Sequence, residues 1–181
     1  MSCERRSPPA EPRIGSLCTG YGGLDLAVLA VLGGTLAWVA DNDPAAARLL
    51  AARFPAIPNL GDITCLDWAA VPGVDVLTAG FPCQDISHAG RRAGIAGPRS
   101  GLWRHIAVAV GGLRPRLVFV ENVAALRTRG LGVVLTDLAA LRYDTAWVCL
   151  RASDVGAAHR RDRLFLLAAR AARHAADPVR P

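Results

Sequence analysis

The segment VDVLTAGFPCQ, residues 74–84, combines a buried strand with a reactive side chain, and it decides how the fold is interpreted. Its first part, Val74 to Ala79, is a largely apolar run with the length and composition of a strand covered on both faces. Cys83 follows shortly after this strand, where a doubly wound sheet places its ligand cleft. Pro82 fixes the backbone φ angle beside the cysteine and removes a competing N–H donor. A thiol held in this way is suited to attack on an electrophilic carbon.

Strands and helices alternate along the chain. We expect strands at residues 13–18, 35–40, 74–79, 117–120, 145–150 and 164–168, and helices at residues 23–32, 44–54, 101–113 and 131–141. This alternation predicts an α/β fold with a doubly wound, Rossmann-like sheet. The strands lack polar alternation, so we expect helices to cover both faces of the sheet. Residues 1–12 are expected to form a flexible arm, residues 13–170 one domain, and residues 171–181 a polar tail.

Composition narrows the class of protein. The chain has 181 residues, 52% of them hydrophobic, which is enough for one packed domain. The formal charge of +6 comes entirely from arginine and is compatible with an acidic partner such as nucleic acid. The five cysteines form no Cys-x-x-Cys pair, so we expect no metal site or disulfide framework, and a cytoplasmic location. Leu24 to Ala40 is apolar, but Asp25 and the Gly33-Gly34 break argue against a membrane span.

Four further motifs lie next to expected strands, and all but one of them follow the strand. The glycine-rich turn at residues 18–23 allows a ligand to approach the backbone at a helix N-terminus, although a turn that needs glycine for packing would look the same. Asp41 ends the second strand, where this fold places an acid on ribose hydroxyls; a helix N-cap is the alternative. Glu121-Asn122-Val123 follows another strand, and Arg161-Asp162-Arg163 precedes the last one. The last strand must therefore run antiparallel for Arg163 to reach the same cleft.

These motifs, in this order, resemble the DNA cytosine C5-methyltransferase family from about residue 14 to about residue 168. The resemblance implies S-adenosyl-L-methionine as the cofactor and DNA as the partner. It places Asp62 near the adenine amine and Ile63 against the adenine ring. The residues that it assigns to the cofactor pocket are Cys18, Thr19, Gly20, Gly22, Gly23, Asp41, Asn42, Asp62, Ile63, Pro82 and Leu102.

The chain departs from the family pattern at three positions. Cys18 stands where the family commonly has phenylalanine, and Asn42 stands where it has a tryptophan that covers the adenine. Both changes remove aromatic surface from the pocket, so we expect weak cofactor binding by the chain alone. His159 replaces a glutamine in the last motif, and both side chains can form hydrogen bonds.

The resemblance also implies catalytic roles. The Cys83 thiolate would add to cytosine C6, which makes C5 nucleophilic toward the sulfonium methyl group. Glu121 would share a proton with ring N3, and Arg163 would hold ring O2. Arg161 is counted among the catalytic residues as well; at alternate strand spacing we expect it beside Arg163 but on the opposite face, and structural support is its alternative role. Taken singly, these residues could equally be a core cysteine, an ion-pair partner and a solvated strand edge.

Residues 84–100 are expected to form a long glycine-containing loop that resembles the family's mobile catalytic loop. That loop closes over DNA after the target cytosine has been flipped out of the helix. The residues expected to contact DNA are Gln84, Ser87, Arg91, Arg92 and Arg99. An ordinary solvated loop is the alternative.

The resemblance also implies a small target-recognition domain after the last motif, and we expect that domain to be missing from this chain. We therefore expect a half-enzyme that needs a separate polypeptide carrying that domain. Two alternatives stay open: a truncated, non-catalytic remnant that binds DNA or cofactor, and an RNA cytosine methyltransferase.

Overall fold

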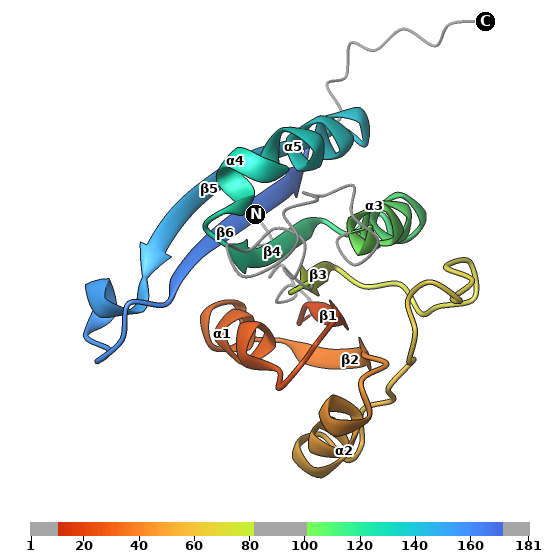
Figure 1. Ribbon diagram of the computed structural model, residues 1–181. Helices are drawn as coiled ribbons and strands as arrows, with labels where there is room; N and C mark the ends of the chain where they lie inside the picture. The colour runs from red at the N-terminus through yellow and green to blue at the C-terminus, as the bar shows by residue number, and fades with distance from the viewer. Residues whose placement is uncertain (1–10, 82–100, 172–181) are drawn as a thin grey trace, which may run out of the picture.

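The computed structural model describes residues 11–81 and 101–171, which form one six-stranded sheet with helices on both faces (Figure 1). The strands are β1 (Arg13–Leu17), β2 (Thr35–Ala40), β3 (Val76–Ala79), β4 (Leu117–Val123), β5 (Tyr143–Arg151) and β6 (Asp162–Arg170). Their order across the sheet is β2-β1-β3-β4-β6-β5; β6 runs antiparallel to both of its neighbours, β4 and β5, and the pairs among β1 to β4 are parallel. The predicted α/β sheet and its antiparallel last strand are confirmed.

All four predicted helices are present, with ends within one residue of those expected. The helical elements are α1 (Gly23–Leu32), α2 (Pro44–Arg53), α3 (Leu102–Leu113), α4 (Leu126–Arg129), α5 (Leu131–Ala140) and the 3₁₀ helix η2 (Ala152–Val155). The short elements α4 and η2 were not expected, since one turn leaves little periodicity to detect. In α2, Pro44 occupies the first turn and the Asp43 carboxylate accepts hydrogen bonds from the N–H groups of Ala45 and Ala46.

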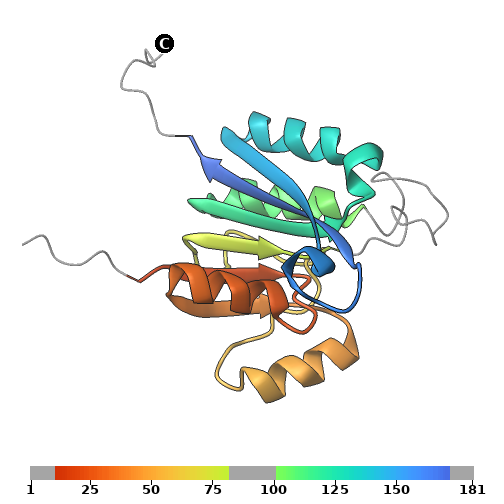
Figure 2. The ribbon, with the colours of Figure 1, turned by 90° about the vertical axis from the view of Figure 1, so that its left-hand side faces the viewer.

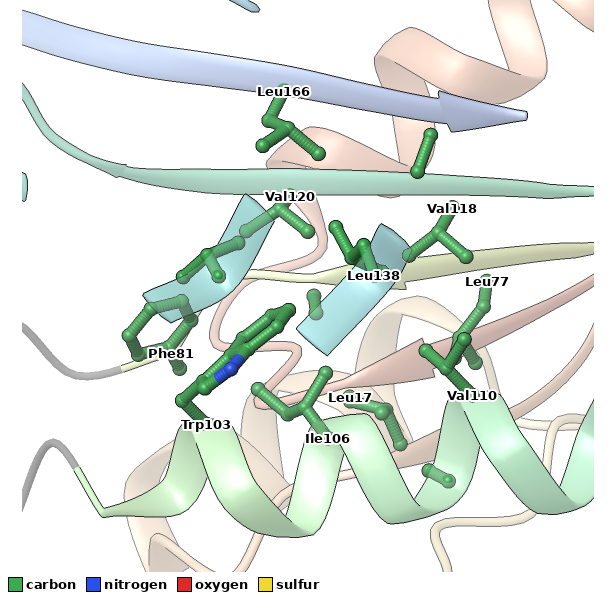
Figure 3. Close-up of a cluster of buried hydrophobic side chains, with 14 of the residues drawn as sticks. Leu17, Leu77, Phe81, Trp103, Ile106, Val110, Val118, Val120, Leu138 and Leu166 are labelled. Carbon is green, nitrogen blue, oxygen red and sulfur yellow. The ribbon is translucent and has the colours of Figure 1, made fainter. Parts of the chain in front are cut away.

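The larger part of the core lies between the sheet and helices α3 and α5. Trp103 and Ile106 project from α3 toward the sheet, and the Trp103 ring lies 5.9 Å from the ring of Phe81, centroid to centroid (Figure 3). The Trp103 indole N–H donates a hydrogen bond of 2.8 Å to Asp137, which ties α3 to α5. A smaller buried cluster lies on the other face beneath α1. The carboxyl ends of β1, β3 and β4 are thereby held in one rigid row.

The expectation that every strand is covered on both faces is wrong for β5 and β6. Apolar side chains of Ala146, Val148, Leu150, Phe165 and Leu167 share one face of these strands and are exposed there, Phe165 by 36% and Leu167 by 37%. Figure 2 shows α1 beside β1 and β2, away from β5 and β6. An apolar residue in a strand predicts that something covers it, but not which segment does so. We call these five residues the open apolar face.

None of the helices in the described ranges has the length and hydropathy that a transmembrane segment requires. The described residues also contain no group of three or more histidine, cysteine, aspartate or glutamate side chains that could hold a metal ion.

Candidate active site

Two adjoining cavities open at the carboxyl ends of the parallel strands. The first, of about 600 Å³, lies between the turn that joins β1 to α1 and the segment that joins β5 to β6. The second, of about 370 Å³, lies between β2 and the residues around Asp62. Cys18, Gly20 and Gly80 line both cavities, so the two form one continuous site. This is the place where open α/β sheets bind ligands.

The glycine-rich turn is held by a side chain from the next strand. Gly20 and Gly22 have left-handed φ angles of 58° and 79°, which disfavour residues with a Cβ atom. The Gly20 N–H donates a hydrogen bond of 2.8 Å to the Asp41 carboxylate. The Thr19 hydroxyl accepts from the Ala40 N–H at 3.3 Å and thus ties the same turn to β2. Gly22 caps α1 without lining either cavity, whereas Thr19, Gly20 and Gly23 line the first.

The second cavity contains the other residues expected to bind the nucleoside part of a cofactor. Asp41, Asn42, Asp62, Ile63 and Leu102 all line it. The Asn42 amide donates to the Asp62 carboxylate at 3.0 Å, so the residue in the tryptophan position holds an acceptor in place. Hydrogen bonds from Thr64, with a smaller contribution from Asn42, hold the pKa of Asp62 below its ordinary value. An ionised carboxylate therefore faces this cavity at neutral pH.

Cys18 lies at the junction of the two cavities and is half-buried. Burial raises the pKa of its thiol to about 12, and the negative charges of Asp41 and Asp62 add to the effect. Only a thiolate is an effective nucleophile, so Cys18 forms part of the pocket wall and is unsuited to attack on a substrate.

Glu121 and Arg163 meet on the wall of the first cavity. Arg163 Nε lies 2.8 Å from Glu121 Oε1, and the two side chains are 22% and 25% exposed. Both residues belong to paired strands, whereas the expected strand ends left Glu121 after one strand and Arg163 before another. The contact exists because β6 runs antiparallel to β4 and brings its first residues beside the last residues of β4. Charge-assisted contacts of this kind also orient both groups.

The expected position of Arg161 is wrong. Arg161 lines the first cavity together with Arg163, so the two side chains do not lie on opposite faces. Side chains two residues apart in an extended chain point to the same side, so the spacing of Arg161 and Arg163 places them on one face. His159, which stands where the family commonly has glutamine, is exposed and lines neither cavity.

Asn122 has a structural task that sequence reasoning did not assign. Its side chain is 1% exposed and donates a hydrogen bond of 3.1 Å to the backbone carbonyl of Phe81. This contact anchors the end of β3 to the end of β4, one residue before Pro82. The sequence could have indicated a role for Asn122, because this residue belongs to the Glu121-Asn122-Val123 motif. Leu150 and Val155 also line the first cavity, and nothing in the sequence pattern pointed to them.

Several predicted site residues lie outside the described residues. These are Pro82, Cys83, Gln84, Ser87, Arg91, Arg92 and Arg99, all in the segment 82–100. The chain enters this segment from the site itself, since Gly80 lines both cavities and Phe81 is buried.

Comparison with known proteins decides the family. The family model for C-5 cytosine-specific DNA methylases matches residues 13–179. The chain belongs to the C-5 cytosine-specific DNA methylase family. It is 34% identical to the type II methyltransferase M.DsaV of Dactylococcopsis salina over 155 residues, which cover 83% of this chain and 44% of that protein. It is 33% identical to M2.BsuMI of Bacillus subtilis over 164 residues, which cover 86% of this chain and 41% of that protein. This C-5 methylase chain thus spans less than half the length of these curated relatives.

Solved structures share the fold of this methylase. The S. pombe Dnmt2 methyltransferase has a TM-score of 0.72 at 21% identity, with 87% of this chain and 50% of that chain covered. The Entamoeba histolytica methyltransferase EhMeth has a TM-score of 0.74 at 18% identity, with 90% and 54% covered. These likenesses show a methyltransferase-type sheet.

Proposed function

We propose that this chain transfers a methyl group from S-adenosyl-L-methionine to C5 of cytosine in DNA, through a covalent bond between Cys83 and cytosine C6. The observation that carries the proposal is the Glu121–Arg163 contact of 2.8 Å on the wall of a cavity that also contains the glycine-rich turn. Two groups that can hold a pyrimidine ring edge thereby face the place where a cofactor would bind.

The residues present fit the proposed cofactor. The backbone at Gly20 and Gly61 leaves open space, since a Cβ atom built at either position would meet no atom within 4 Å. Asp41 suits ribose hydroxyls, and the ionised Asp62 suits the amine of adenine. Ile63 and Leu102 add apolar surface to the same cavity. When bound, the cofactor supplies an electrophilic methyl group on a positively charged sulfur.

The chain's own side chains would prepare the cytosine. Cytosine C5 is a weak nucleophile while the ring is aromatic, so addition of the Cys83 thiolate to C6 is the activating step. Negative charge then spreads toward N3, where a proton shared with Glu121 stabilises it. Arg163 uses Nε toward Glu121 and Nη1 toward the Asp162 carbonyl, which leaves further N–H donors for ring O2. Once C5 carries the methyl group, transfer of the C5 proton to a solvent water would break the bond between C6 and the Cys83 sulfur, which releases the thiolate and restores the aromatic ring.

We also propose that further polypeptide, such as a separate subunit with a target-recognition domain, completes the enzyme. Two observations support this proposal. The curated relatives are more than twice as long as the matched region, and the five apolar residues of the open apolar face lie exposed on one side of β5 and β6. Base-specific contacts to DNA would come from that further polypeptide.

The test is methyl transfer from labelled S-adenosyl-L-methionine to duplex DNA, with single-stranded RNA as a parallel substrate. The protein is assayed alone and with any product of a neighbouring gene. Label in DNA at C5 of cytosine is the expected result. Label in RNA alone would replace DNA by RNA as the substrate. Cofactor binding without transfer to either nucleic acid, in every combination, would favour the non-catalytic remnant.

The Asp62 carboxylate is expected to contribute directly to cofactor affinity. Asp62→Asn should weaken S-adenosyl-L-methionine binding about tenfold, because a charge-assisted hydrogen bond is lost. Asp67→Asn is the matched control: the same charge is removed from an exposed residue outside both cavities. Calorimetric titration measures the affinity of each variant for S-adenosyl-L-methionine. Equal affinities for the two variants would exclude Asp62 from the binding site.

A further inference from the structure

The lining of the first cavity carries more positive than negative charge. Three arginines, Arg151, Arg161 and Arg163, and two acidic residues, Asp25 and Glu121, belong to it. Glu121 lies 2.8 Å from Arg163, so these two opposite charges offset each other. The net charge of the cavity therefore depends on whether Asp25 offsets one of the other two arginines.

Asp25 does not offset them, because it is almost completely buried. It belongs to the first turn of α1 and is 1% exposed. The Thr78 hydroxyl donates a hydrogen bond to its carboxyl group, and Ser16 is a second hydrogen-bond partner. Burial raises the pKa of this carboxyl above its ordinary value and so favours the neutral form. Arg151 and Arg161 thus leave the cavity positively charged and suited to an anion.

Both of these arginines are available to a ligand. The Arg151 side chain is 61% exposed, and its Nε lies 3.8 Å from Asp162, which lines neither cavity. An exposed pair at this distance contributes little to stability, so it yields to a stronger partner. Arg161 is exposed, and among the described residues its side chain has no ion-pair or hydrogen-bond partner. A guanidinium group in this situation is suited to form charge-assisted hydrogen bonds to an anion.

The backbone holds the two arginines in one frame at the rim of the cavity. The Arg151 N–H donates a hydrogen bond of 2.9 Å to the Asp154 carboxylate of η2. The Ala152 N–H donates one of 3.2 Å to the Arg161 carbonyl, which joins the two segments where β5 ends and β6 begins. Both side chains therefore start from fixed, neighbouring positions, which lowers the entropy cost of binding one ligand with both.

Their place relative to Arg163 matches the geometry of a nucleotide. Glu121 and Arg163 would hold N3 and O2 of a cytosine, and their side chains are only 25% and 22% exposed. Around the pyrimidine ring, N3 is followed by the carbon that carries O2 and then by N1, which carries the sugar. The sugar and its phosphates would therefore lie beyond Arg163 as seen from Glu121. Arg161, two residues before Arg163, and Arg151, whose register partner is Asp162, occupy the more exposed positions beside Arg163.

We propose that Arg151 and Arg161 form a phosphate subsite at the rim of the first cavity, which holds the phosphodiester groups flanking the target cytosine. The inference rests on the proposed function, because it presumes that a cytosine occupies the cavity. The planar donors of arginine match phosphate oxygens, and such contacts position a strand without reading its sequence. Both arginines are thus positioning residues that set the depth of the nucleotide in the cavity.

The test measures binding of the whole chain to short DNA strands that contain a single cytosine, with S-adenosylhomocysteine present. A single strand is used because its cytosine need not be flipped out of a duplex. One strand is unmodified, one has neutral methylphosphonate linkages on both sides of the cytosine, and one has the same two linkages far from it. Fluorescence anisotropy should show about tenfold weaker binding with the flanking neutral linkages and less than about twofold with the remote ones.

The variant Arg151→Gln/Arg161→Gln should bind the unmodified strand about tenfold more weakly, and flanking neutral linkages should then weaken binding by less than about twofold more. This loss of sensitivity to one pair of phosphates is a readout that a merely structural role would not change. Arg160→Gln is the matched control, since it removes the same charge from an exposed residue outside both cavities. That variant should keep the full effect of the flanking linkages.

Equal effects of flanking and remote linkages on the unaltered chain would overturn the inference, and so would an Arg160→Gln variant that behaves like Arg151→Gln/Arg161→Gln. The cofactor carboxylate is the other anion that suits these arginines. Calorimetric titration should therefore show the same S-adenosylhomocysteine affinity in Arg151→Gln/Arg161→Gln as in the unaltered chain. A weakened affinity, with the effect of the flanking linkages retained, would assign the arginines to the cofactor and overturn the inference. If the unaltered chain bound none of the strands, with and without the product of a neighbouring gene, the proposed function itself would be refuted.

Discussion

Cys83→Ala is expected to abolish both methyl transfer and covalent trapping of the protein on DNA that contains 5-fluorocytosine. Fluorine at C5 blocks the proton loss that normally expels the cysteine, so the adduct accumulates as a protein–DNA band resistant to denaturation. Without a thiol at position 83 no adduct can form, and C5 remains a weak nucleophile. The loss should exceed that of any other single substitution at the site.

Three of the other four cysteines provide the controls for this experiment. Cys65 is exposed and Cys149 is half-buried, and neither lines the two cavities, so alanine at either position should leave trapping intact. Cys18→Ala should change cofactor affinity without loss of trapping, because burial and nearby acidic groups raise the pKa of the Cys18 thiol to about 12. If trapping persisted in Cys83→Ala and disappeared in Cys18→Ala, the nucleophile would be Cys18 and our assignment of Cys83 would be wrong.

Glu121→Gln should lower turnover by roughly one to two orders of magnitude or more, as expected for an acid–base group. Its DNA affinity should change little, because the stabilisation of charge at N3 grows only as sulfur adds to the ring. Single-turnover methylation and a separate DNA-binding titration distinguish the two quantities. Unchanged turnover would place Glu121 in a structural role.

The partner of Glu121 allows a stricter test. Arg163→Lys keeps the positive charge but loses the planar set of donors, and it should also lower turnover. Because the two side chains are in contact at 2.8 Å, the double variant should lose less than the product of the two single losses. The exposed pair Arg151–Asp162, at 3.8 Å, is the control: Asp162→Asn should leave turnover within about twofold of the unaltered chain.

Local sequence determined the elements and their order. The helices begin and end within one residue of the expected positions, because hydrophobic periodicity and the residues that start or stop a helix are local features of the sequence. Pro44 in the first turn of α2 is an example of a residue that marks a helix start. The antiparallel last strand was also predictable, since Arg163 precedes its strand while the other motifs follow theirs. The cavity-lining positions of Asp41, Asp62, Ile63 and Leu102 agree with the motif assignment, and their binding roles stay predictions.

Tertiary structure alone decided which of these residues meet. The Glu121–Arg163 contact depends on the register between β4 and β6, and the burial of Asp25 depends on β1 and β3 packing against α1. Neither register nor packing leaves a local pattern in the sequence, because both are set by segments far apart in the chain. The same reason explains the wrong expectation for β5 and β6: their apolar side chains indicate a covered face, and only the assembled sheet shows that α1 stops short of it.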